Sequence, residues 1–227
     1  MNRRSLSLAA LAVATMCVTG CSILQPRPDR TRYYFLSAVA GPGQPSEQPV
    51  GGDLTVGLGP LKLPDYLSRT ERAVRVGPNQ LRYIEDDRWA EPMDANVARV
   101  LSQNLTAHLG TARVVVLPTL QAARRTYDVP LEILRFESTA NGNAELHARW
   151  GIKDAQTGEI VLTTETHVAE SAQGADAAAA VAALSRALDR WSEEIAAAVL
   201  RVRAAHPTSS AEDDRPTRRK GSEEPRR

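Results

Sequence analysis

The chain has 227 residues, of which 42% are hydrophobic and 24% are charged. This length and composition suit one ordinary globular domain with appendages at its ends. The formal net charge is +1 and falls to about −1 once Arg3 and Arg4 leave with the leader described below, a value too close to neutral for a nucleic-acid-binding protein. We therefore exclude nucleic acid as a partner.

Residues 1–20 have the pattern of a lipoprotein signal peptide. Two arginines precede the apolar run 6–18, which is too short to span a bilayer comfortably. The run ends in the sequence VTGC at 18–21, which resembles the bacterial lipobox, where the cysteine is acylated and becomes the first residue of the mature protein. The alternative is an ordinary secretory leader that happens to contain a cysteine.

Cys21 is the predicted lipidation site, and its covalent lipid is the only attached group that we expect; no cofactor is predicted. Cys17 leaves with the leader, so the mature domain has no disulfide and no thiol site. By resemblance to lipoprotein sorting in Gram-negative envelopes, Ser22 in place of Asp favours the outer membrane. Residues 21–30 are predicted to form an extended tether that reaches at most about 30 Å.

The first half of the predicted domain, which spans 31–203, contains short strands and one helix. Alternating apolar residues indicate strands, and Gly- and Pro-rich stretches indicate turns and loops. The expected elements are a strand at 33–36, a surface loop at 41–52, a strand at 54–63, a hairpin of 74–76 with 81–83, a helix after Pro92, and a strand at 114–117 that is buried on both faces.

The helix after Pro92 is specified at both ends. Pro92 suits a first helical position, and Gly110 can take the left-handed conformation that ends a helix. Its apolar residues recur at spacings of three and four, which predicts one buried stripe. The opposite face is expected to carry Asp94, Asn96, Arg99, Gln103 and His108. A strand, a helix and a buried strand in succession suggest a crossover with parallel pairing.

The second half predicts an antiparallel meander covered by a helix. Strands are expected at 127–133, 146–152 and 160–168, with a turn at Asn141-Gly142 and another at 154–158. An apolar stripe over 176–203 predicts a helix that packs on this sheet, or alternatively a coiled-coil seam for a partner. Residues 204–227 are predicted to be a disordered charged tail.

No pattern of catalytic or metal-binding residues is found. The histidines lack the spacing that places two ligands on one helix face, and neither a nucleophile elbow nor a phosphate-binding loop is present. Glu85, Asp86 and Asp87 could form an acidic metal cluster, but neighbouring side chains on a strand end point to opposite faces, so we expect a solvated turn. The sequence therefore predicts a protein that is not an enzyme and holds no metal.

Three segments carry a resemblance to a known family. The first two contain the motifs PDYL-x-R at 64–69 and RWAEP at 88–92, called the first and the second motif below. The run VGLGPLKLPDYLSR at 56–69, the segment RWAEP at 88–92 and the helix segment LSQNL at 101–105 resemble the ABC-type transport auxiliary lipoprotein family. The resemblance extends over about 31–202 and includes the D-x-x-T-G turn at 154–158. It implies an α/β domain with a mixed sheet packed by helices, similar to the N-terminal domain of TolB.

The same resemblance implies partners. Lipoproteins of this family are attached at the outer membrane and work with MCE-domain proteins, which form lipid-conducting assemblies across the periplasm, and with inner-membrane transport partners. The implied function is therefore a non-enzymatic subunit that docks to or terminates such an assembly. Two alternatives stay open, namely a carrier that holds a lipid in its own apolar pocket and a protein that merely braces the envelope.

The two motifs supply the predicted partner-binding residues. Asp65, Tyr66 and Arg69 follow a strand that ends in proline, so we expect them on a loop, where binding residues are readily presented. Arg88, Trp89 and Glu91 stand at the helix entrance, and Trp and Arg are enriched at interface hot spots. The predicted partner-binding residues are therefore Asp65, Tyr66, Arg69, Arg88, Trp89 and Glu91.

These residues allow two interpretations. The motifs lie together and form a docking face for the MCE partner, or a contact in a homo-oligomer. Alternatively, Trp89 fills the core while Arg88 or Arg69 pairs with Glu91 or Asp65 to hold two loops together.

Overall fold

The computed structural model describes residues 28–39, 54–110, 113–119 and 124–206. The predicted leader, the lipidation site Cys21, most of the tether and of the charged tail, and the loop at 41–52 lie outside the described residues. The chain divides into two units, Met1–Arg32 and Tyr33–Arg227, and the second holds the fold.

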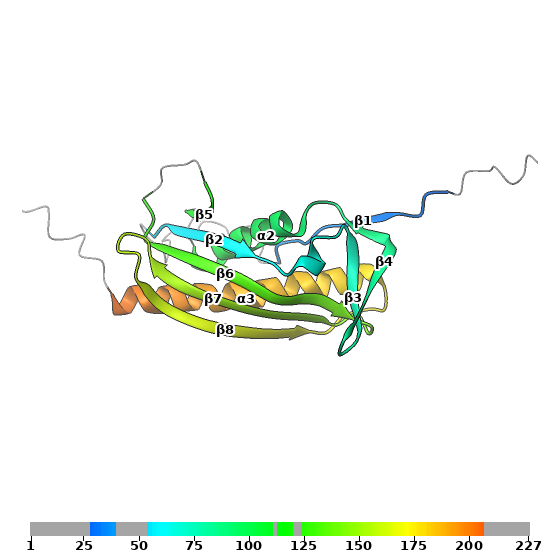
Figure 1. Ribbon diagram of the computed structural model, residues 1–227. Helices are drawn as coiled ribbons and strands as arrows, with labels where there is room; N and C mark the ends of the chain where they lie inside the picture. The colour runs from blue at the N-terminus through cyan, green and yellow to red at the C-terminus, as the bar shows by residue number, and fades with distance from the viewer. Residues whose placement is uncertain (1–27, 40–53, 111–112, 120–123, 207–227) are drawn as a thin grey trace, which may run out of the picture. The chain divides into compact units, whose positions relative to one another are not determined.

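The second unit is built on one mixed sheet with two long helices (Figure 1). This confirms the predicted fold class; the specific likeness to TolB stays a prediction. The elements are β1 Arg32–Tyr34, β2 Val56–Lys62, the 3₁₀ turn η2 Asp65–Leu67, β3 Glu71–Gly77, β4 Gln80–Trp89, α2 Met93–Leu109, β5 Val114–Val116, β6 Tyr127–Thr139, β7 Ala144–Asp154, β8 Ile160–Glu170 and α3 Ala177–Ala205.

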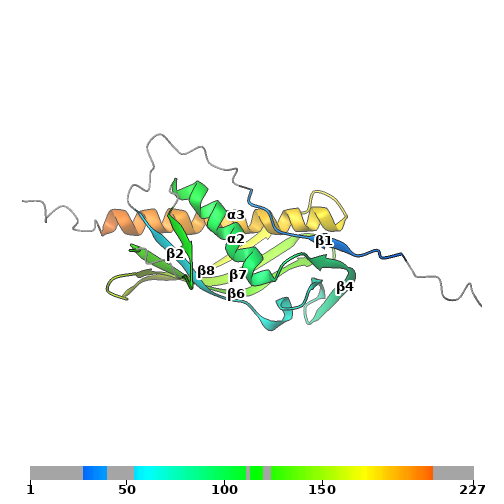
Figure 2. The ribbon, with the colours of Figure 1, turned by 90° about the horizontal axis from the view of Figure 1, so that it is seen from above.

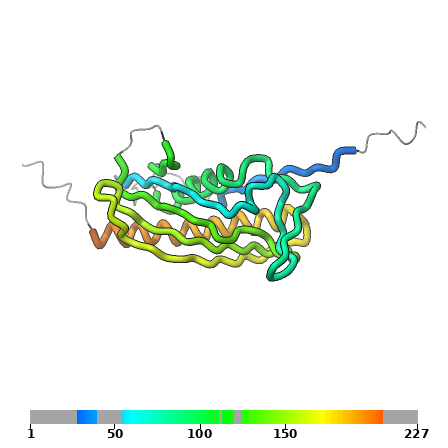
Figure 3. The backbone as a smooth tube through the Cα atoms, in the orientation of Figure 1, coloured from blue at the N-terminus to red at the C-terminus, as the bar shows by residue number. Residues whose placement is uncertain are grey.

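Strand β6 is the centre of the sheet. On one edge β6 has two parallel neighbours. Its first part pairs with β2 as far as Lys62 and Glu132, and its last part pairs with β3, where Val74 faces Ser138. On the other edge β6 pairs with β7, and β7 with β8, as the predicted antiparallel meander. Figure 3 traces the hairpin of β3 and β4 across the end of β6.

Helix α2 ends where the sequence predicted and begins one residue later. Pro92, predicted at the first helical position, is its N-cap, and Gly110 at the C-cap has φ 60° and ψ 32°, the left-handed conformation. Its apolar stripe is buried, from Met93 to Leu109. Asn96 was expected on the exposed face but is fully buried, because its side-chain oxygen accepts a hydrogen bond from the amide of Leu36 at 3.0 Å.

Helix α3 covers the meander, as predicted. It packs on β6, β7, β8 and α2. In Figure 1 these strands lie in front of it, and Figure 2 shows α2 crossing α3 obliquely. Its apolar residues from Val181 to Val199 are buried in the common core. The stripe is therefore used inside the domain, and the coiled-coil alternative is wrong. Asp176 caps the helix by accepting a hydrogen bond from the amide of Ala179 at 2.7 Å.

Two further predictions need correction. The run at 114–117 forms the predicted parallel pair with β2, but within the described residues β5 has no second neighbour and Val116 is 38% exposed, so it is an edge strand. Glu85, Asp86 and Asp87 lie inside β4, not in a solvated turn.

Candidate functional site

The turn η2 lies beside β6 between its two parallel neighbours. Pairing with β2 ends at Glu132 and pairing with β3 begins at Ser138, so the intervening stretch of this edge has no strand beside it. The turn carries the first motif and is closed by hydrogen bonds from the amides of Leu67 and Ser68 to the carbonyls of Pro64 and Asp65. Leu67 is buried and anchors the turn in the core.

Tyr66 binds the edge of β6 that the strands leave open. Its hydroxyl donates to Oε2 of Glu137 at 2.5 Å and accepts a hydrogen bond from the amide of Phe136 at 3.1 Å. Its carbonyl accepts a hydrogen bond from the hydroxyl of Tyr83 at 3.2 Å. Every polar group that Tyr66 brings to this site is thus directed into the domain, so its hydroxyl is not free for a partner.

Glu137 is the centre of this buried cluster. Its side chain is fully buried, and Oε1 accepts hydrogen bonds from Nε of Arg75 at 2.5 Å and from Nε of Arg135 at 2.6 Å. Burial raises the pKa of Glu137, but the donors on Tyr66, Arg75 and Arg135 outweigh it and hold the pKa below its ordinary value. Burial, and then the bond to Glu137, raise the pKa of Tyr66. At neutral pH the cluster therefore holds an ionised carboxylate and a neutral phenol.

A second buried pair fixes the hairpin beside this cluster. Nη2 of Arg72 lies 2.9 Å from Oδ2 of Asp87, and its Nη1 donates to the hydroxyl of Ser138 at 3.0 Å. Asp87 is 1% exposed. One member of the predicted solvated run is therefore a buried anion, and no group of three potential metal ligands occurs among the described residues.

The second motif is mostly used inside the domain. Trp89 is 7% exposed and belongs to the core. Glu91 accepts hydrogen bonds from Nη2 of Arg99 at 2.5 Å and from its Nε at 3.1 Å, which fixes the strand end to α2. The core interpretation is therefore right for Trp89, but the ion pairs proposed with it are wrong because Glu91 pairs with an arginine of α2.

The two motifs do lie together, as predicted. The amide of Trp89 donates to the carbonyl of Thr70 at 2.8 Å, and Arg88 faces Glu71 across the hairpin. Nε of Arg69 lies 3.5 Å from Oε2 of Glu71, and its guanidinium stands 4.4 Å from the centre of the Tyr83 ring. The arginine is thus held over the hairpin and not paired with Asp65.

Asp65 and Arg69 are the motif side chains that remain exposed, with Arg88 partly so. We call these three the motif surface. It lies on a turn and a hairpin that the two buried ion clusters fix to β6. Glu137 and Arg75, which fix it, could not be recognised from the sequence, since neither stands in a recognisable motif. The one available signal is a charged residue within an apolar strand.

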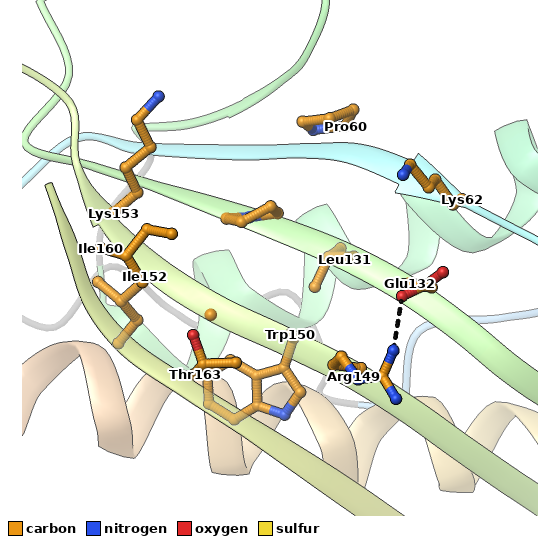
Figure 4. A pocket seen from close by; sticks show the side chains of 12 residues that line it. Pro60, Lys62, Leu131, Glu132, Arg149, Trp150, Ile152, Lys153, Ile160 and Thr163 are labelled. Carbon is orange, nitrogen blue, oxygen red and sulfur yellow. Dashed lines mark hydrogen bonds and ion pairs between the residues drawn. The ribbon is translucent and has the colours of Figure 1, made fainter. Parts of the chain in front are cut away.

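A groove lies elsewhere on the domain, on the sheet face opposite the helices (Figure 4). Residues of β2, β6, β7 and β8 line it, and its volume is about 270 Å³. We call it the outer-face groove. It is lined by Pro60, Lys62, Pro130, Leu131, Glu132, Arg149, Trp150, Gly151, Ile152, Lys153, Ile160 and Thr163.

Comparison with known proteins places the chain in a family. A crystal structure of an uncharacterized protein matches with a TM-score of 0.61 and 17% identity, over 74% of this chain and 98% of that one. XCC0632 from Xanthomonas campestris, of family DUF330, matches with a TM-score of 0.62 and 17% identity, over 78% of this chain and 99% of that one. At such identity these two likenesses establish the fold alone.

No curated protein matches the sequence. None of the described helices is long and apolar enough to cross a membrane. The sequence model of the ABC-type transport auxiliary lipoprotein component matches residues 34–196, which include both motifs and the central strand. The chain therefore belongs to the family of ABC-type transport auxiliary lipoprotein components.

Proposed function

We propose that this protein is a non-enzymatic lipoprotein, anchored at the periplasmic face of the outer membrane through Cys21, that docks to or terminates an MCE-type lipid transport assembly. Family membership supports a role beside an ABC-type transporter. The lipobox-like leader supports the anchor, and Ser22 after the cysteine favours the outer membrane. The MCE-domain partner is the one that the motif resemblance implies.

The observation that carries the docking role is the fixation of the motif surface. Tyr66 and Glu91 are bound inside the domain and Trp89 is buried, whereas Asp65 and Arg69 stay exposed on the same rigid corner. A preorganised surface loses little conformational entropy when a partner binds. Opposite charges on one corner also favour a partner of complementary charge pattern.

A carrier of whole lipids is less well supported. The described core is filled by side chains of both helices and of the sheet. The outer-face groove holds about 270 Å³, just below the roughly 300–1,000 Å³ of pockets that enclose drug-sized ligands. A two-chain lipid does not fit inside it.

The proposal is tested by crosslinking in native envelopes followed by purification through a tag on the C-terminal tail. Recovery of an MCE-domain protein with the wild type, and release of the Cys21→Ser protein from the outer membrane, are the expected results. Recovery of bound phospholipid with no MCE-domain protein would overturn the docking role. A crosslinked species at a multiple of the chain's own mass would identify the motif surface as a contact between copies.

The motif surface itself is tested by the double substitution Asp65→Arg and Arg69→Glu. Both side chains are exposed, so the fold should persist while recovery of the partner falls at least several-fold. The matched control reverses two exposed charges on α3, Glu193→Arg and Arg201→Glu, and should leave recovery unchanged. Equal recovery from both variants would remove the motif surface from the interface.

A further inference from the structure

We propose that the outer-face groove binds part of one acyl chain of an anionic phospholipid, with the lipid phosphate beside Lys62 or Lys153, the two lysines at its ends. The groove is separate from the motif surface. The lining of the groove indicates a ligand with a hydrocarbon part and a negative charge. That this ligand is a phospholipid rests on the proposed function in lipid transport.

The floor of the groove is apolar and cannot be filled by the protein's own side chains. Gly151 lies in the middle of β7, and an added Cβ there would stand 2.5 Å from the carbonyl oxygen of Leu162. Only glycine fits at this position, so the strand presents no side chain at this point of the outer face. Pro60 and Pro130 flank it, and Ile160 at the start of β8 is 67% exposed. Water therefore covers apolar surface that a ligand could bury.

Hydrocarbon suits this floor better than a peptide does. The backbone of β6 and β7 is engaged in the sheet ladders on both edges of the groove floor, and Pro60 and Pro130 carry no amide hydrogen. A docked peptide would place its own amides and carbonyls against surfaces that cannot pair with them, which is costly. An acyl chain has no such groups and gains about 0.8 kcal/mol for each methylene that it buries.

The charge around the groove selects an anion. Nη2 of Arg149 lies 2.8 Å from Glu165 and its Nη1 lies 3.3 Å from Glu132, so its charge is balanced locally. Lys62 and Lys153 have no ion-pair partner within the part of the chain that the structure describes. Figure 4 shows these two lysines at different ends of the groove. The groove thus offers, beside apolar surface, two lysines that form no ion pair within the described residues.

The size of the groove limits the ligand to part of one chain. The second chain and the remainder of the lipid stay outside, in a membrane or in a partner. The site is consequently a contact point for a lipid that passes by, and differs from the enclosed pocket of a carrier.

Photo-crosslinking of the full-length, lipidated protein in its native envelope tests this inference. The photoreactive residue p-benzoylphenylalanine replaces Thr163, which lines the groove. In the matched control it replaces His167, which is exposed on the same face of β8 but four residues away, or about 13 Å along the strand. Cells are labelled in parallel with ³²P-phosphate and ¹⁴C-palmitate. The labels are read in the tryptic peptide 154–186, which holds both positions and is separated from the lipid that the protein itself carries on Cys21.

We expect a protein adduct that carries both labels at Thr163, at least five-fold above the level at His167. Each of the substitutions Lys62→Gln and Lys153→Gln should lower the amount of this adduct by roughly 1.5- to 5-fold, the range for exposed ion pairs. The control substitution Arg201→Gln on α3 should leave the amount unchanged. An adduct with ¹⁴C but no ³²P would replace the phospholipid by a fatty acid and overturn the stated source. Equal labelling at the two positions, or an adduct with a second protein or a second copy, would overturn the site.

This outcome is independent of the docking test. If the MCE-domain protein is recovered but Thr163 acquires no lipid, the docking function stands and the groove inference fails. If position 163 acquires lipid but no MCE-domain protein is recovered, the groove inference stands and the docking function fails.

Discussion

Replacing Tyr66 by phenylalanine removes a single oxygen from the junction between η2 and β6. The hydroxyl group donates a hydrogen bond to Glu137 and accepts one from the amide of Phe136. The ring can stay in place, so the change isolates the two hydrogen bonds. If Tyr66 served mainly to bind a partner, the same change would leave the stability of the domain untouched.

The expected loss follows from these contacts. A hydrogen bond to a charged group contributes about 1.5–3 kcal/mol, and leaving a buried donor unpaired costs roughly 1–3 kcal/mol. Glu137 keeps its two arginine donors, so only the buried Phe136 amide is left unpaired, and we expect a total in the lower part of the combined range, about 2–4 kcal/mol. For a domain of this size each kcal/mol lowers the melting temperature by about 2–4 °C, which gives a fall of roughly 5–15 °C.

Thermal melting and urea unfolding, followed by circular dichroism, measure this loss. Tyr33→Phe is the matched control, because Tyr33 is 63% exposed and makes none of these contacts; its effect should stay within about 0.5 kcal/mol. A Tyr66→Phe protein as stable as this control would refute the reasoning that the turn is fixed to β6 through the phenol.

Three further outcomes follow from the same structure. Trp89→Ala should lower the stability by about 3–5 kcal/mol in urea unfolding, because it empties a core position; lost partner binding at an unchanged melting temperature would contradict this. The pKa of Glu137 lies below its ordinary value, so its stabilising effect is present above about pH 4.3 and fades as the pH falls through the folded pKa. The difference in urea midpoint between wild type and Glu137→Gln should therefore shrink from about pH 6 to pH 3, and a constant difference would exclude the linkage. Asp176→Ala should cost about 0.5–2 kcal/mol in thermal melting, while Asp176→Asn, which still caps, should cost little; equal losses would exclude capping.

The local elements of the fold could be predicted because their signals are local. Pro92 and Gly110 mark the ends of α2, and Asn141-Gly142 marks the turn between β6 and β7. The alternation of apolar and polar residues along β6, β7 and β8 identifies the buried face of these strands. Apolar residues at spacings of three and four identify the buried face of α3. Each of these patterns is complete within one element, so no knowledge of its neighbours is needed.

The errors arise where burial depends on neighbours. The apolar run Val114–Val116 has the composition of a central strand, yet it stands at an edge because no strand of the described residues lies beyond it. Asn96 has a polar side chain on a helix, but the amide of Leu36, distant in sequence, makes burial favourable. Asp87 is buried because Arg72 faces it from the partner strand.

The candidate site, too, could be predicted from the sequence only in part. The resemblance identified the two motifs, and their adjacency followed from the hairpin that joins them. The roles of the individual residues did not follow, because Tyr66 and Glu91 could be assigned only once Glu137 and Arg99 were found beside them. The outer-face groove had no sequence signature, since it is made by residues of four strands that each look ordinary.

The central place of β6 also sets the order in which the chain can fold. The strands β2 and β3 find their parallel partner only after about seventy and sixty further residues have been joined, as the pairs Val56 with Tyr127 and Val74 with Ser138 require. Such distant contacts raise the contact order and slow folding. A chain that emerges from its N-terminus must hold these strands without β6 until that strand emerges. During that interval its unpaired edges are open to aggregation and to chaperones.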